Sequence, residues 1–122
     1  MALRGIRGAT TVDTDTKEAI WHASQLLMTK LMSANQLNFD QVGAAIFSST
    51  EDLTAAFPTT GVRHLPAFSM IPMFDTREPA IKDSLPMCIR VLLLVDSELG
   101  AHELTHIYLK KAKNLRPDLT GN

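Results

Sequence analysis

Two arginines occupy the centres of apolar segments that have the composition of β-strands. Arg7 lies within residues 5–12, and Arg90 lies within residues 88–95. A guanidinium keeps its proton at physiological pH and is rarely buried without a partner. A strand with an arginine at its centre must therefore direct that side chain toward a carboxylate or an anionic ligand. Two such strands predict a fold that forms an anion pocket on its sheet.

The size and charge of the chain limit the classes of protein that it can represent. With 122 residues, of which 45% are hydrophobic and 20% charged, it is long enough for one domain with a substantial core. We expect that domain to span residues 1–117 and to be followed by a flexible tail at 118–122, since Pro117 ends the last element. A formal net charge of −1 gives no general attraction for nucleic acid or for an anionic membrane, so neither is an expected partner.

The length of the apolar runs and the presence of a single cysteine predict where in the cell the protein is located. The amino terminus lacks the apolar region of a secretory signal, and the longest purely apolar run, Val91 to Val95, is far too short to cross a bilayer. The one cysteine, Cys88, excludes an internal disulfide and is interpreted as a small core residue. These features predict a soluble cytoplasmic protein.

The first half of the chain alternates between strand and helix patterns. A strand is expected over residues 3–12, and several N-cap candidates at residues 13–16 precede a helix that ends near Asn35. That helix has apolar residues at spacings of three and four, namely Ile20, Ala23, Leu27, Leu31 and Ala34. The following pattern predicts a helical turn at 39–42, a strand at 43–49, a loop at 50–53 and a short helix that begins at Pro58.

The second half of the chain predicts further strands, but the secondary structure of the last third of the sequence is not decided by its pattern. Residues 70–74 are expected to form an edge strand because they contain Pro72, and a polar excursion at 75–87 precedes the Arg90 strand. Residues 98–115 have helix-forming composition, while residues 106–109 alternate like a strand, and periodicity alone does not decide between them. The elements together predict an α+β fold, a mixed sheet with helices packed on one face.

One short motif suggests a metal site. His102, Glu103 and His106 match the H-E-x-x-H pattern, which on a helix places two imidazoles on one face for zinc. A catalytic zinc needs a third protein ligand, and beyond His106 the sequence contains no histidine, glutamate or cysteine, only Asp118. We therefore expect no metal and no cofactor, and a zinc hydrolase remains a minor alternative.

A series of segments through the chain resembles one family. They are residues 4–12 (RGIRGATTV), 50–53 (TEDL), 56–58 (AFP), 62–63 (VR), 77–78 (RE), 88–91 (CIRV), 106–109 (HIYL) and 115–119 (LRPDL). In this order they resemble the monofunctional, trimeric AroH class of chorismate mutases over nearly the whole chain. The resemblance implies a homotrimer with pseudo-barrel α/β packing, active sites at subunit interfaces, and conversion of chorismate to prephenate by a Claisen rearrangement in aromatic amino acid biosynthesis, part of the shikimate pathway.

The resemblance also implies roles for individual residues. It assigns Arg90, Glu78 and Arg7 as catalytic residues, with Arg90 on the side-chain carboxylate and ether oxygen of the substrate, Glu78 on the ring hydroxyl and Arg7 on a carboxylate. The other positions that it assigns bind substrate: Tyr108 on a carboxylate, Phe57 and Leu115 along the ring, Arg63 and Arg116 near the mouth, and Asp75 near the ring hydroxyl. It places residues 106–109 in a strand that follows a short turn.

Two positions depart from the family pattern. Thr60 stands where relatives have a lysine at the rim, and Asp75 stands where some have a cysteine. A carboxylate beside a dianion is unfavourable, so we expect the Asp75 side chain to point away or the residue to contribute only backbone groups.

Two alternative functions, each from another class of protein, would use the same residues. A non-catalytic binding module for an aromatic-pathway dicarboxylate could use the same arginines without turnover. A trimeric imine deaminase of similar size is a second alternative, but the combination of Arg7, Glu78 and Arg90 argues against it.

Overall fold

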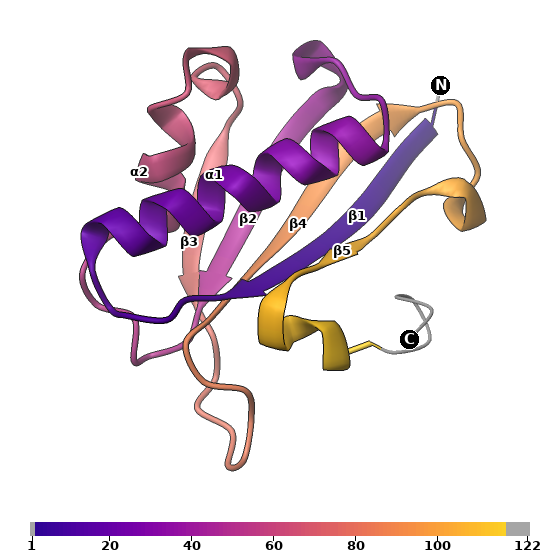
Figure 1. Ribbon diagram of the computed structural model, residues 1–122. Helices are drawn as coiled ribbons and strands as arrows, with labels where there is room; N and C mark the ends of the chain where they lie inside the picture. Colours follow the sequence, from indigo (N-terminus) through magenta and orange to yellow (C-terminus); the bar gives the residue numbers. More distant parts are fainter. Residues whose placement is uncertain (1, 117–122) are drawn as a thin grey trace.

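The computed structural model describes residues 2–116, and these residues form one five-stranded sheet (Figure 1). Its strands in chain order are β1 (Ala2–Thr11), β2 (Val42–Ser49), β3 (Met73–Arg77), β4 (Cys88–Ser97) and β5 (Ile107–Tyr108). Their order across the sheet is β3-β2-β4-β1-β5. Pro117 and the tail predicted at 118–122 lie outside the described residues.

The sheet is mixed, as the sequence predicts. The central strand β4 pairs antiparallel with β1 on one side and with β2 on the other. Both edge strands pair parallel to their neighbours, β3 to β2 and β5 to β1. The α+β class inferred from the sequence is therefore confirmed.

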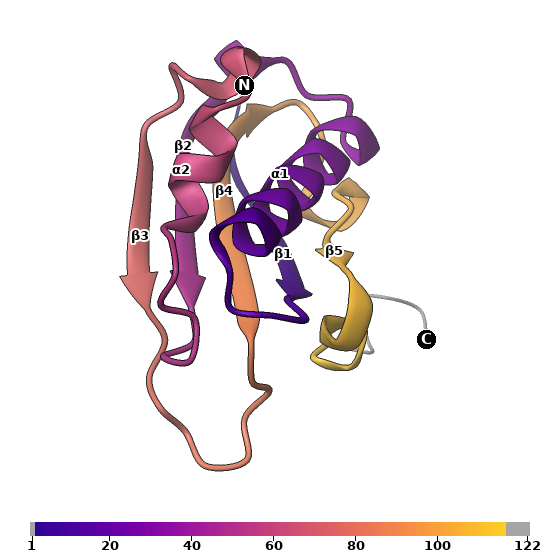
Figure 2. The same ribbon diagram turned by 60° about the vertical axis from the view of Figure 1, so that its left-hand side comes forward.

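Two α-helices cover one face of this sheet. Helix α1 (Lys17–Ala34) begins after Thr16, whose hydroxyl accepts a hydrogen bond of 3.2 Å from Ala19 N, and it ends at the C-cap Asn35. Helix α2 (Pro58–Arg63) begins at the predicted proline and packs beside α1. Figures 1 and 2 show both helices on the same side of the strands. The predicted positions of both helices are confirmed.

The core lies between α1 and the sheet. Its fully buried side chains include Ile6, Leu27, Leu31, Phe47 and Leu93. Two glycines permit the close approach of the layers: a Cβ on Gly8 would lie 2.8 Å from the Leu31 side chain, and one on Gly61 would lie 2.7 Å from the Trp21 Cα. An added methyl group at Gly61 would require a shift of α1, whereas one at Gly8 would require the end of the Leu31 side chain to move.

The opposite side of the sheet, which we call the open face, has no α-helix over it among the described residues (Figure 2). Because side chains alternate along a strand, the residues between the core positions point to this face. They include the exposed apolar side chains of Ile46, Phe74 and Leu92, which lie next to one another in the register of β3, β2 and β4. Arg7 is directly opposite Leu92 in the same row and is also exposed. Arg7 therefore lies in a strand, as the sequence predicts, and its side chain is on the open face.

The edge strand β3 is shifted relative to the prediction. It begins at Met73 and ends at Arg77, so residues 75–77 belong to the strand and not to the polar excursion. Pro72 has no N–H to donate and lies just before the strand, where its carbonyl accepts a hydrogen bond of 2.9 Å from Ala45 N. The prediction that this strand lies at an edge is confirmed.

The last third of the described chain contains short elements. Two 3₁₀ turns, η3 (Ala101–Glu103) and η4 (Lys110–Asn114), flank the two-residue strand β5. The helical turn predicted near Phe39 is the 3₁₀ turn η1 (Phe39–Gln41), and a further turn, η2 (Pro66–Phe68), follows α2. No helix in the described part of the chain is long and apolar enough to span a membrane.

Candidate active site

A cleft of about 390 Å³ opens on the open face, and residues from all five strands line it. We call it the Arg90 cleft. It is lined by Arg7, Gly8 and Ala9 of β1, Ile46 and Ser48 of β2, Thr76 of β3, Arg90, Val91 and Leu92 of β4, and Tyr108 of β5.

Strand register explains why these residues meet. Ala9 pairs with Arg90 on one side and with Tyr108 on the other, while Ser48 pairs with Arg90 and with Thr76. One row of paired residues therefore crosses the sheet from Tyr108 to Thr76, with Arg90 in the middle strand. Since paired residues point to the same face, the row directs a phenol, a guanidinium and two hydroxyls into one cleft.

Arg90 is held by the carboxylate of Glu78, which follows β3. The Arg90 Nε and the Glu78 Oε1 are 2.5 Å apart, and the Glu78 side chain is only 15% exposed. The buried Nε–H has no aligned hydrogen-bond acceptor among the described residues, so the contact is an ion pair. The Arg90 side chain is 40% exposed, which leaves part of the guanidinium accessible from the cleft. The partner that the sequence requires for this strand arginine is thus Glu78.

Glu78 is itself fixed by β2. Its backbone N–H donates to the Ser49 carbonyl at 2.9 Å, and its Oε1 accepts a hydrogen bond of 3.1 Å from the Ser48 hydroxyl. Both contacts of the carboxylate use Oε1. Glu78 supports Arg90 but does not itself line the Arg90 cleft.

Cys88, two residues before Arg90, is buried in the core as the sequence predicts. Desolvation raises the pKa of its thiol to about 11, although the nearby Arg90 cation opposes this shift. The thiol stays protonated at neutral pH and is a poor nucleophile.

Tyr108, Leu115 and Arg116 lie at the β5 side of the cleft. Tyr108 is buried in a small cluster with Ala9 and Ala112, against which Leu85 and Leu115 pack. Burial is the largest cause that lowers the pKa of the His106 imidazole, and the Arg7 and Arg116 cations lower it further. Arg7 and Arg90 line the cleft, whereas Arg116 does not.

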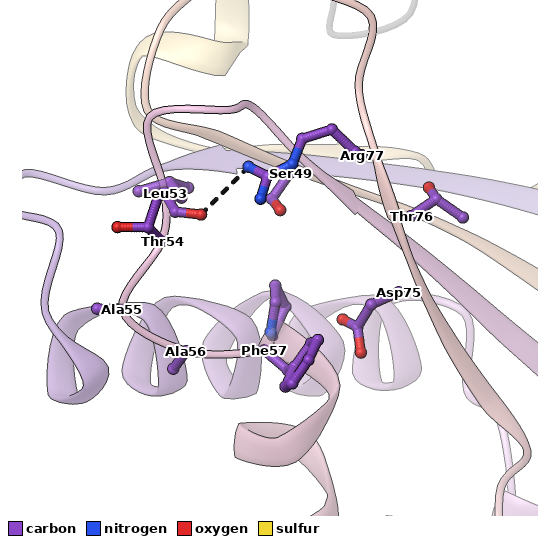
Figure 3. A pocket seen from close by; sticks show the side chains of 10 residues that line it. Ser49, Leu53, Thr54, Ala55, Ala56, Phe57, Asp75, Thr76 and Arg77 are labelled. Atoms are coloured by element: carbon purple, nitrogen blue, oxygen red, sulfur yellow. Dashed lines mark hydrogen bonds between the residues drawn. The ribbon is translucent and has the colours of Figure 1, made fainter.

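Phe57 and Asp75 line a different cavity of about 480 Å³, which we call the Phe57 pocket (Figure 3). The Asp75 carboxylate accepts hydrogen bonds from the Thr59 backbone N–H at 3.2 Å and from the Thr59 hydroxyl. This carboxylate points toward α2, and Asp75 does not line the Arg90 cleft. Figure 3 also shows Arg77 turned toward the Leu53 carbonyl, which accepts from Arg77 Nη1 at 3.3 Å.

The loop at the wall of the Phe57 pocket is fixed by Asp15. Its carboxylate accepts hydrogen bonds from the Thr54 hydroxyl at 2.8 Å and from the Thr54 and Ala55 backbone N–H groups, each at 3.0 Å. The Thr54 hydroxyl is the main cause that lowers the pKa of Asp15, and the Ala55 N–H adds to it. This pocket is therefore shaped by bonds within the chain.

The single chain does not bring every residue assigned from the sequence into one site. Phe57 is 66% exposed and Arg63 is exposed on α2, where its Nη2 donates to the Thr60 hydroxyl at 3.1 Å. Neither residue lines the Arg90 cleft, and Thr76 is the residue that both cavities share.

The H-E-x-x-H segment does not form a helix that would align two imidazoles. His102 lies in η3, whereas His106 immediately precedes β5 and its Nδ1 accepts a hydrogen bond of 3.0 Å from Arg7 N. The Glu103 carboxylate accepts from Gly100 N at 2.8 Å. No group of three or more metal-ligating side chains occurs within residues 2–116.

Sequence reasoning missed Ser48 and Thr76 as cleft residues. Ser48 follows Ile46 on the open face of β2, and Thr76 follows Phe74 on the open face of β3. A hydroxyl residue at such a position is a weak signal in a single sequence. Only the register that aligns Ser48 with Arg90 distinguishes them from ordinary strand residues.

The fold and the cleft define a class of protein, an α+β domain with an arginine-lined anion cleft on the uncovered face of a mixed sheet. Residues 3–119 match the family model of chorismate mutase type I. Over 118 residues the chain is 42% identical to chorismate mutase AroH of Thermus thermophilus, with 96% of each chain covered. Over 120 residues it is 38% identical to chorismate mutase AroH of Bacillus subtilis (strain 168), covering 98% of this chain and 94% of the relative.

The structural comparison agrees with these relatives. A chorismate mutase from Clostridium thermocellum superposes with a TM-score of 0.86 and 34% identity, covering 89% of this chain and 96% of that one. The chain therefore belongs to the chorismate mutase type I family. It is a chorismate mutase, an isomerase of aromatic amino acid biosynthesis.

Proposed function

We propose that this chain converts chorismate to prephenate in the Arg90 cleft by conformational restriction and electrostatic stabilisation. The observation that supports this most directly is the Arg90–Glu78 ion pair at the centre of a strand row that also carries Tyr108. Chorismate carries two carboxylates, and a cleft bordered by Arg7 and Arg90 offers a cation to each. Arg116, near the same end of the sheet, adds positive charge at the mouth.

The rearrangement breaks the ether C–O bond while a C–C bond forms within the same molecule. Negative charge grows on the ether oxygen as that bond breaks, and a cation fixed beside the oxygen stabilises the transition state more than the ground state. We assign this role to the accessible part of the Arg90 guanidinium. Glu78 holds Arg90 through Oε1, and its other oxygen is suited to accept the ring hydroxyl.

The reaction is unimolecular, so a large translational proximity effect is not available to the enzyme. What remains is the selection of the folded substrate conformer in which the enolpyruvyl chain lies over the ring. Tyr108, packed with Ala9 and Leu115, forms one wall for that conformer. No nucleophile or proton transfer is needed, which is consistent with a buried Cys88 thiol that stays protonated.

We assign Phe57 and Arg63 to the Arg90 cleft of a neighbouring subunit. Within one chain they are exposed and lie outside the Arg90 cleft. The apolar row of Ile46, Phe74 and Leu92 on the open face is suited to contact other copies, because burial of such side chains is favourable. A homotrimer with pseudo-barrel packing would cover this row and bring Phe57 and Arg63 of one subunit to the Arg90 cleft of the next.

The site proposed here requires no metal or organic cofactor, and we place the protein in the cytoplasm. Loss of the chorismate absorbance, followed in the presence of a chelator, tests the function. Chorismate should disappear at an unchanged rate with chelator and prephenate should accumulate. Binding of chorismate without turnover would instead support the non-catalytic binding module, and activity restored only by zinc would support a hydrolase.

A further inference from the structure

His106 occupies a position that neither the zinc motif nor the proposed reaction explains. The parallel ladder between β1 and β5 pairs only Gly8 with Ile107 and Ala9 with Tyr108. One residue earlier, the Arg7 N–H meets the His106 ring and donates to Nδ1 at 3.0 Å. The imidazole thus replaces a backbone carbonyl at the end of the ladder and satisfies a strand N–H that would otherwise lack a protein acceptor.

The backbone on both sides of His106 is held in place. Thr105, just before it, exchanges two hydrogen bonds with the C-cap Asn35 of α1, at 2.7 Å from Thr105 N to Asn35 Oδ1 and 2.9 Å from Asn35 Nδ2 to the Thr105 carbonyl. Ile107, just after it, is in the β1 ladder. The half-buried imidazole is therefore a fixed acceptor for the Arg7 main chain.

The charges around the ring favour its neutral form. The groups that face it are Arg7 from β1 and Arg116 from the end of the described chain, while Glu103 of η3 is bonded to Gly100 N. Burial lowers the pKa of His106, and the two guanidinium cations lower it further. A protonated ring would also present an N–H at Nδ1 toward the Arg7 N–H, where an acceptor is needed.

We propose that neutral His106 is a positioning residue that fixes the Arg7 main chain, and with it the direction of the Arg7 guanidinium in the cleft, and that protonation of His106 releases this constraint. The inference rests on the proposed function, because its consequence is weaker capture of a dianionic substrate. His106 does not touch the reacting atoms.

Two substitutions separate the hydrogen bond from the titration. His106→Ala removes the acceptor and should raise KM about fivefold near pH 7.5, the equivalent of one lost hydrogen bond, with the turnover number nearly unchanged. His106→Asn keeps an acceptor oxygen near the position of Nδ1 but does not titrate. It should have the wild-type KM near pH 7.5 and should lack the loss of kcat/KM that the wild type shows when the pH falls and His106 becomes protonated.

His102→Asn is the matched control, since it changes the other histidine of the motif, which is exposed in η3, and should keep the wild-type pH profile. Equal KM values for His106→Ala and the wild type, or the same acid limb in His106→Asn and the wild type, would overturn the inference. Nitrogen NMR of the His106 ring gives a readout without turnover. The Nε2–H tautomer at neutral pH is expected, and an Nδ1–H tautomer would overturn the inference even if chorismate were not converted and the proposed function had failed.

Discussion

The two faces of the sheet use charged residues in different ways. On the face covered by the helices, Arg77 donates to the Thr50 and Leu53 carbonyls and the Asp75 carboxylate is bonded to Thr59. On the open face, Arg90 forms an ion pair with Glu78, and its side chain remains partly exposed in a cleft. The Arg77 and Asp75 side chains are thus bonded within the chain, whereas we propose that the accessible part of Arg90 binds a ligand.

The same contrast holds for apolar residues. Leu93 of β4 is fully buried under the helices, while its neighbour Leu92 is 38% exposed on the open face. The covered face therefore stabilises the subunit, and we propose that the cations of the open face bind substrate while its apolar side chains contact another copy.

The largest effect is expected for Arg90→Gln, which removes the cation and keeps much of the side-chain reach. The turnover number should fall at least about a hundredfold, by analogy with the loss of a transition-state donor in other enzymes. Saturated turnover of the folded variant is the measurement. Lys82→Gln makes the same charge change on an exposed loop and should behave as the wild type. Near-native turnover with weakened binding would mean that Arg90 only holds the substrate.

On the covered face, Leu93→Ala should lower the free energy of unfolding by about 2–5 kcal/mol, because it leaves a cavity in a close-packed core. Denaturant unfolding at fixed protein concentration measures this change. Ile81→Ala, at a 64% exposed loop residue, is the control and should have almost no effect. A loss below about 1 kcal/mol for Leu93→Ala would show that the core readily collapses around the cavity.

Phe74→Glu tests the open face as an interface between copies. Phe74 is 70% exposed and does not line the Arg90 cleft. We expect the wild type to be a trimer in solution and the variant to dissociate, since a carboxylate would be buried without a partner at the interface. Light scattering gives the mass of each. A stable, active monomer of the wild type would contradict both the interface and the roles assigned to Phe57 and Arg63.

Arg63→Ala should have a smaller effect that appears mainly in KM. Its guanidinium is exposed on α2 and is proposed to reach the mouth of a neighbouring cleft, where it attracts the dianion without contacting the breaking bond. Steady-state kinetics should show KM raised severalfold and a turnover number close to the wild type. A turnover number reduced as strongly as in Arg90→Gln would instead place Arg63 at the reacting atoms.

A change of pH is expected to have the smallest effect on the turnover number. Between roughly pH 6 and 9 the turnover number should be nearly flat, because no residue exchanges a proton in the chemical step. The Cys88 thiol does not titrate in this window, since its pKa is raised to about 11 and it loses its proton only near that pH. Saturated rates across the window are the measurement. A bell-shaped profile would indicate acid–base catalysis and contradict the proposed mechanism.

Much of the secondary structure is predictable from local patterns. The spacing of apolar residues and the cap at Thr16 define α1, and Pro58 marks the start of α2. Residues 75–77 were expected to lie outside the strand because Asp75, Thr76 and Arg77 are polar, whereas pairing with β2 makes them strand residues. The last third was ambiguous because its short elements depend on pairing with β1 and not on their own periodicity.

The α+β class, the core position of Cys88, the need for a partner beside Arg90 and, through its motifs, the family can all be inferred from the amino-acid sequence alone. These depend on local spacing and on the fixed cost of burying a charge. The tertiary structure is needed to show that this partner is Glu78 and that Ser48 and Thr76 share the row of Arg90. It is also needed to show that His106 accepts a hydrogen bond from the Arg7 N–H. Each of these contacts joins residues distant in the chain, and strand register, which sets them, results from the packing of the whole sheet.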